Sequence, residues 1–122
     1  MTVLLVAVLG GCGAVARFLV DRLVSRHSPG ARVPLGTIVI NLTGAFLLGL
    51  ITGWWAAHAG DPTVRLVLGT GFLGGYTTFS TASVEGGRLV GGRDLRGAVL
   101  HSGGMLVVSV AAAALGWWLG SL

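Results

Sequence analysis

Four long apolar runs separated by short connectors constrain the fold of this chain more than any other feature. They cover about residues 3–24, 34–57, 64–88 and 98–119. Each matches the roughly 20 residues that an α-helix needs to cross the hydrocarbon core of a membrane. The connectors hold glycine, proline and charged residues, which are typical of turns, and helices joined this tightly run antiparallel. The sequence therefore predicts an all-α integral membrane protein in which residues 1–122 form a single four-helix unit.

The composition excludes a water-soluble domain. Hydrophobic residues make up 53% of the chain and charged residues only 10%, with a mean hydropathy of +0.87. Soluble domains are about 25% charged. The net charge of +4 would suit nucleic acid. However, the cationic residues are all arginines, placed singly and mostly near the ends of the apolar runs. That placement is typical of proteins embedded in lipid, so we expect no nucleic-acid partner.

The arginines also predict an orientation in the membrane. Six of them lie in or beside the first and third connectors, whereas only Arg65 lies beside the second. By the positive-inside rule the first and third connectors face the cytoplasm, so both termini are expected outside the plasma (inner) membrane. The tryptophans gather at the opposite ends of the second and fourth runs, where aromatic rings settle among lipid headgroups. They are Trp54, Trp55, Trp117 and Trp118.

Polar residues inside the third run indicate a functional segment, because lipid cannot satisfy such groups. They are densest over residues 69–85, where Gly74 and Gly75 precede several threonines. Adjacent glycines and β-branched residues both weaken a helix. We therefore expect a break near Gly75 that frees backbone carbonyls at mid-membrane depth. The alternative is a continuous helix in which Gly71 and Gly75 only let a neighbouring helix approach closely.

Three other polar residues in the runs each have two interpretations. Asn41, which shares a helical face with Thr37 and Gly44, either bonds a neighbouring helix or offers its amide hydrogens to a desolvated anion. Arg17 either extends its guanidinium to the membrane surface or serves as a fixed positive charge. Glu85, near the end of the third run, either pairs with an arginine or lies at the interface.

Glycine and histidine positions add two simpler expectations. Two pairs of glycines four residues apart predict close helix packing. They are Gly49 with Gly53 and Gly116 with Gly120. The histidines lack the spacing of metal ligands, so we expect them to be solvated or interfacial. They are His27, His58 and His101.

Three stretches together resemble the Fluc (CrcB) fluoride channel family over essentially the whole chain. They read GGCGAVAR over 10–17, LGTIVINLTGAF over 35–46 and GFLGGYTTFST over 71–81, and the last is highly specific. The resemblance implies four-helix subunits that assemble as antiparallel (inverted) dimers with two pores for passive fluoride export. It also implies a structural sodium ion (Na+) at the dimer centre.

The same resemblance assigns roles to individual residues. Sodium would be held by backbone carbonyls of Gly74 and Thr77, repeated in the partner. The residues implied to line the fluoride pore are Asn41, Phe79, Ser80, Thr81 and Ser109. Fluoride is small and strongly hydrated, so amide and hydroxyl hydrogens and the positive edges of aromatic rings would have to replace its water. Carbonyl oxygens of an unwound helix suit a hard cation such as sodium.

Two features depart from the family pattern. The usual Thr-Thr-Phe-Ser-Thr-Phe sequence ends here in Ala82, so its second phenylalanine is missing. Dual-topology homodimers of the family need little arginine bias, whereas this chain has six arginines against one. We hypothesise a subunit of fixed orientation that pairs with a separate inverted homologue, with the dual-topology homodimer as the alternative.

Two other functions compete with conduction by this chain. A non-conducting subunit that only supports its partner's pore would also explain Ala82. A small multidrug resistance type transporter has a similar size and four spans. It needs an ionisable carboxylate inside the membrane, and the first run has none before Asp21 at its end. An enzyme is not expected, because no set of nucleophile, base and orienting group is visible.

Overall fold

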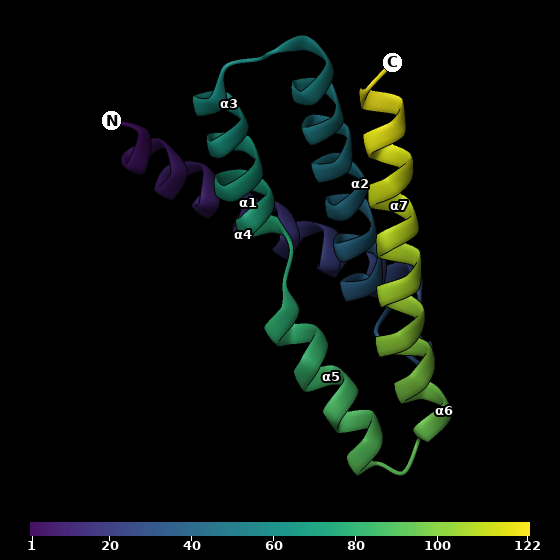
Figure 1. Ribbon diagram of the computed structural model, residues 1–122. Helices are drawn as coiled ribbons and strands as arrows, with labels where there is room; N and C mark the ends of the chain where they lie inside the picture. The colour runs from purple at the N-terminus through teal and green to yellow at the C-terminus, as the bar shows by residue number, and fades with distance from the viewer.

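The computed structural model describes all residues, 1–122, and every regular element in it is helical (Figure 1). In chain order the elements are α1 (Thr2–His27), α2 (Leu35–His58), α3 (Pro62–Leu66), the π-helix η1 (Val67–Leu73), α4 (Gly74–Tyr76), α5 (Phe79–Gly91), α6 (Leu95–Ala98), the π-helix η2 (Val99–Gly104) and α7 (Met105–Gly120). The helices α3, η1 and α4 follow one another without a gap, as do α6, η2 and α7. The predicted all-α class is confirmed.

Three helical stretches are long and apolar enough to cross a membrane. They are Thr2–His27, Leu35–His58 and Leu95–Gly120. The third expected run is instead divided into two shorter pieces, one ending with α4 and the other formed by α5. Figure 1 shows non-helical ribbon between these two pieces. The chain therefore has the helices of a membrane protein, and one of its four apolar runs is interrupted.

The helices α2 and α7 lie side by side along most of their length (Figure 1). Their contact depends on glycine: a Cβ added at Gly49 would stand 2.1 Å from the carbonyl oxygen of Ala113, and one at Gly53 would stand 2.1 Å from that of Trp117. From the other side, a Cβ at Gly116 would stand 2.2 Å from the carbonyl oxygen of Phe46, and one at Gly120 2.2 Å from that of Leu50. Any side chain at these positions would force the backbones apart, so the predicted packing role of both glycine pairs is confirmed.

The long helix α1 passes behind the other helices at a steep angle and packs on η1 and α4 (Figure 1). Here too the contact is backbone to backbone. A Cβ at Gly75 would stand 2.0 Å from the carbonyl oxygen of Gly10, and one at Gly13 would stand 2.0 Å from that of Phe72. The small buried cluster of Ile40, Leu73 and Tyr76 lies next to this contact. The first half of the third run is thus fixed to the bundle.

An ion pair joins the first and third connectors. Both nitrogens on one edge of the Arg32 guanidinium donate to the Asp94 carboxylate, with Nε 3.0 Å from Oδ2 and Nη2 bonded to Oδ1. Asp94 also caps α6, because its Oδ1 accepts the Gly97 amide at 2.9 Å. Hydrogen bonding from Arg32, and then from the Gly97 amide, lowers the pKa of Asp94 below its usual range. The two connectors richest in arginine therefore lie at one end of the molecule, which we call the basic end.

Candidate functional site

The third run unwinds at two threonines. The helix α4 ends at Tyr76, and α5 begins at Phe79. The two residues between them have extended backbone: Thr77 with φ −79° and ψ 158°, and Thr78 with φ −149° and ψ 123°. Gly74 and Gly75 remain helical, so the interruption lies two residues beyond the position that the sequence indicated. Gly75 packs against α1 while it remains helical, whereas the β-branched threonines that follow favour extended backbone.

Asn41 on α2 holds the extended segment through both polar atoms of its side chain. Its Nδ2 donates to the Thr78 carbonyl oxygen at 3.0 Å, and its Oδ1 accepts the Thr78 amide at 3.0 Å. Nδ2 also lies 3.3 Å from the sulfur of Met105, which is a weak acceptor. Of the two interpretations of Asn41, the structure shows the bond to a neighbouring segment. One amide hydrogen faces only the thioether and can be given to a better acceptor.

The bonds between Asn41 and Thr78 alter the hydrogen bonding of the neighbouring Gly74 and Thr77 carbonyls. In an uninterrupted helix the Thr78 amide would bond the Gly74 carbonyl, and the Thr81 amide would bond the Thr77 carbonyl. Here the Thr78 amide donates to Asn41, and the Thr81 amide donates to the Thr78 hydroxyl at 3.3 Å. The carbonyl oxygens of Gly74 and Thr77 have therefore lost their helical donors, and Gly74 is exposed. Oxygens of this kind are ligands that hard cations prefer.

A cavity of about 580 Å³ opens beside the interruption, between α2, the third run and α7. Five of the residues implied to bind fluoride or sodium line it: Asn41, Gly74, Thr77, Phe79 and Ser109. The Ser109 hydroxyl is buried there without a hydrogen-bond partner. The Phe79 ring is 87% exposed, so it stands at the rim of the cavity. The arrangement offers amide and hydroxyl donors inside an otherwise apolar space.

Ser80 and Thr81 lie apart from this cavity, in the first turn of α5. Their hydroxyls surround that of Thr78, with Thr78 Oγ1 at 3.3 Å from Ser80 Oγ and 3.1 Å from Thr81 Oγ1. Both side chains are exposed. Thr78 acts as the N-cap of α5, a role that sequence reasoning missed, although a threonine three residues before a polar helical residue is a signal for it. Arg17 is half-buried on α1 and has no carboxylate within ion-pair distance.

The expectation for His101 was wrong, because its side chain is completely buried. Its Nε2 lies 3.3 Å from the Ala82 carbonyl oxygen and 3.5 Å from Glu85 Oε2. Glu85 therefore faces a histidine, and it pairs with no arginine. The other two histidines, His27 and His58, are exposed, as expected. His101 lies on η2 near the start of the fourth apolar run, and α5 packs against η2 there, a contact that no local sequence pattern signals.

Comparison with known proteins gives a consistent result. The family model described as "CrcB-like protein, Camphor Resistance (CrcB)" matches residues 4–120. "Fluoride-specific ion channel FluC 1" of Leifsonia xyli subsp. xyli is 50% identical over 100% of this chain and 88% of its own. "Fluoride-specific ion channel FluC 2" of Cutibacterium acnes is 54% identical over 99% of this chain and 98% of its own. "Fluoride-specific ion channel FluC" of Hydrogenobaculum sp. is 44% identical over 100% of this chain and 99% of its own.

Proposed function

The chain belongs to the CrcB-like protein family, a family of ion channels and not of enzymes, and on this basis we propose that it forms a pore for passive fluoride export. The observation that carries the proposal is the Asn41 clamp on Thr78, which opens a donor-bearing segment next to a cavity in the bundle. Passive export lowers cytoplasmic fluoride, because the membrane potential drives an anion outward. Relatives about half identical over the whole chain and named fluoride-specific ion channels support the choice of ion.

Fluoride entering the cavity needs replacements for its water of hydration. We assign this role to the free amide hydrogen of Asn41, the Ser109 hydroxyl and the edge of the Phe79 ring, all of which border the cavity. Ser80 and Thr81 continue the donor path along the first turn of α5. The buried Ser109 hydroxyl supports this role, since a partnerless donor is what an arriving anion requires.

A structural sodium ion fits the carbonyls of Gly74 and Thr77. Both oxygens have lost their helical donors, and two such oxygens from an inverted partner would complete the set. Bound there, the cation would supply positive charge that lowers the electrostatic cost of an anion nearby. The residues of this chain hold those oxygens in place: Asn41 fixes Thr78, and the Thr77 hydroxyl donates back to the Leu73 carbonyl at 2.8 Å.

The partner that we favour is an inverted homologous subunit. Phe79 and Gly74, both exposed beside the interruption, indicate a surface that a second subunit completes. The arginine bias favours a heterodimer over a dual-topology homodimer, because a biased chain inserts one way. The basic end would then face the cytoplasm, with both termini outside the plasma (inner) membrane and membrane lipid around the exposed apolar helices.

Ala82 favours a second candidate function, that of a non-conducting partner subunit. Ala82 borders the cavity beside the interruption and is 4% exposed. The phenylalanine that the family pattern has at this position would give the cavity a different lining. In this alternative, only the pore formed by the other subunit's residues conducts. Multidrug transport has no such support, since no carboxylate lines the cavity beside the interruption.

Fluoride efflux from liposomes tests the proposal. The chain is reconstituted alone and together with a candidate inverted homologue, and efflux is followed with a fluoride electrode. We expect fluoride efflux from the pair without matching chloride efflux, and a large loss when Asn41→Ala is introduced in this chain. Flux that survives Asn41→Ala but stops on substitution of the partner would favour the non-conducting role.

A further inference from the structure

Met105 faces Asn41 inside the cavity beside the interruption. Both residues line this cavity, and the Met105 sulfur lies 3.3 Å from Asn41 Nδ2. Nδ2 also donates to the Thr78 carbonyl oxygen at 3.0 Å. A carboxamide nitrogen carries two hydrogens, so the thioether is the partner of the second one, and a thioether is only a weak acceptor. One hydrogen of the clamp is therefore held by the weakest of its acceptors.

Met105 interrupts a row of hydroxyl groups along one wall of the cavity. Ser102, Met105 and Ser109 are spaced by three and four residues, so they share one helical face, and all three line the cavity. A serine hydroxyl can donate a hydrogen bond, whereas a thioether can only accept one. An anion on this wall thus finds a donor on either side of Met105. At Met105 itself, the donor is the Asn41 amide hydrogen that the sulfur already holds.

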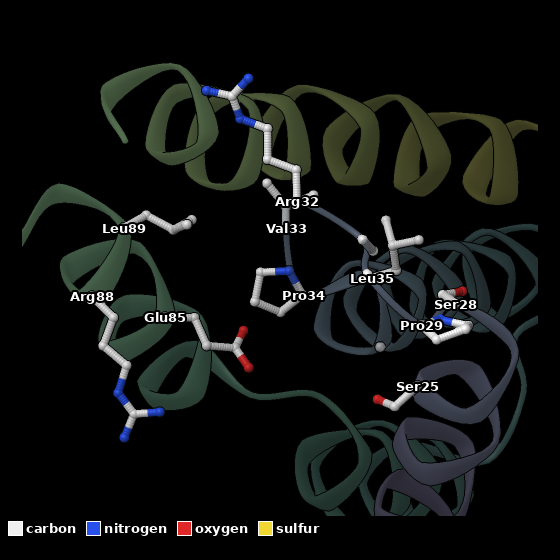
Figure 2. Close-up of a pocket in the computed structure, with 13 residues that line it drawn as sticks. Ser25, Ser28, Pro29, Arg32, Val33, Pro34, Leu35, Glu85, Arg88 and Leu89 are labelled. Carbon is white, nitrogen blue, oxygen red and sulfur yellow. The ribbon is translucent and has the colours of Figure 1, made fainter. Parts of the chain in front are cut away.

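The second large cavity, at the basic end, is less suited to hold an anion. It has a volume of about 500 Å³, and Figure 2 shows the Glu85 carboxylate turned into it, whereas the guanidinium groups of Arg32 and Arg88 turn outward. Arg32 is already paired with Asp94. The cavity beside the interruption has no carboxylate in its lining. An anion is therefore better held in the cavity that contains Met105.

The Met105 side chain has room to move away from Asn41. It is only partly buried, and it borders a cavity of about 580 Å³. Methionine is unbranched and adapts readily to its surroundings. An anion is a better acceptor than a neutral sulfur, because hydrogen bonds to charged groups are about twice as strong as those between neutral groups. A fluoride ion that reaches Asn41 can therefore take the second amide hydrogen from the sulfur, while the bonds from Asn41 to Thr78 remain in place.

We propose that Met105 is a positioning residue for the Asn41 donor: its sulfur keeps the second amide hydrogen turned into the cavity, and an arriving fluoride ion displaces it. The thioether and the ion compete for the same hydrogen, so Met105 raises the fluoride concentration at which flux saturates. The inference rests on the proposed fluoride conduction and adds to it the group that the ion replaces.

Methyl NMR tests the displacement without relying on flux. The chain has two methionines, and Met1 is 93% exposed, so carbon-13 in the methionine methyl groups gives one signal at the cavity and one reference signal. The labelled chain is placed in liposomes with an unlabelled inverted partner. Sodium fluoride should move the Met105 signal and leave that of Met1 in place. Sodium chloride at the same concentration should move neither, since the larger ion attracts an amide hydrogen less strongly. The movement should be lost in Asn41→Ala and kept in Thr43→Ala.

Fluoride efflux at increasing fluoride concentration gives a second readout. Met105→Leu keeps an apolar side chain of similar size and removes the acceptor. The concentration that gives half-maximal efflux should then fall by roughly threefold, as expected for one weak hydrogen bond, with a smaller change in the maximal efflux. Leu106→Met is the matched control, because Leu106 lines the same cavity, is 64% exposed and should leave both quantities as in the unaltered protein.

A Met105 signal that fluoride does not move, in an assembly that conducts fluoride, would overturn the inference, and so would movement that persists in Asn41→Ala. A half-maximal concentration that Met105→Leu leaves unchanged, or that Leu106→Met lowers equally, would also overturn it. If fluoride moves the Met105 signal and no fluoride efflux is found, the displacement stands and the proposed conduction fails. If neither is found, both fail.

Discussion

The α2 and α7 pair and the third helical run are both rich in glycine, yet only the third run unwinds. In the pair, glycines bring two unbroken helices into backbone contact. In the third run Gly75 does the same against α1, and the helix continues through it. The chain unwinds only where two threonines follow and Asn41 supplies the bonds that the helix would have made. Glycine thus explains close packing, and an external hydrogen-bond partner explains the break.

The largest effect should come from breaking the tight pair. In Gly53→Val the added side chain meets the Trp117 carbonyl, and we expect a loss of about 3 kcal/mol in the free energy of unfolding. Thermal unfolding in detergent, followed by circular dichroism, measures it. Gly11→Ala is the control, because nothing lies within 4 Å of its added Cβ. Equal stability of the two variants would mean that α2 and α7 are not in backbone contact.

Removing the external partner sharpens the comparison at the third run. Asn41→Ala leaves the Thr78 amide and carbonyl without partners, which should lower stability by about 2 kcal/mol and fluoride flux by about tenfold or more. Thr43→Ala, on the same helix, loses only bonds to α2 carbonyls and to the Tyr76 hydroxyl and is the control. Unchanged flux in Asn41→Ala would contradict the role of the clamp.

A smaller effect is expected from the cap of α5. Thr78→Val keeps the β-branched shape that favours extended backbone and removes the hydroxyl that accepts the Thr81 amide. The loss of one cap should cost about 1 kcal/mol. Hydrogen exchange of the α5 amides, read by mass spectrometry, should rise in the first turn of the helix. The exposed Thr70→Val provides the comparison, and similar exchange in the two variants would argue against capping by Thr78.

The smallest effect concerns the connectors that join the two regions at the basic end. The bonds from Arg32 and the Gly97 amide lower the pKa of Asp94, so the pair stabilises the fold above the usual range of an aspartate and loses that contribution as the pH falls through the lowered pKa. Asp94→Asn should therefore be slightly less stable at neutral pH, and the difference should vanish in acid. Melting temperatures over a pH series measure it.

The sequence predicted the helical runs and the packing glycines because both follow from local pattern. Hydrophobic length predicts a helix that spans a membrane, and small residues four apart predict a contact. Asn41 was also singled out, since a carboxamide inside an apolar run needs a partner. Its partner, Thr78, lies 37 positions away, and no local pattern specifies a pairing at that distance.

The break was predicted near Gly75 and lies two residues further on, and the burial of His101 was missed, for the same reason. The position of the break depends on which glycine of the third run packs against α1. That glycine is Gly75, which contacts Gly10. His101 looks interfacial by its position in the chain and is buried only because α5 folds back over η2. Both depend on contacts between distant segments.

The most direct test is fluoride efflux from liposomes that contain this chain with an inverted homologue, compared for the unaltered protein and Asn41→Ala. If the segment held by Asn41 forms the ion's path, the unaltered pair releases fluoride and retains chloride, and the variant pair releases fluoride at least about tenfold more slowly. The partner used is one that does not itself conduct fluoride. Equal fluoride efflux from the unaltered pair and from the Asn41→Ala pair would then contradict a path along the segment that Asn41 holds.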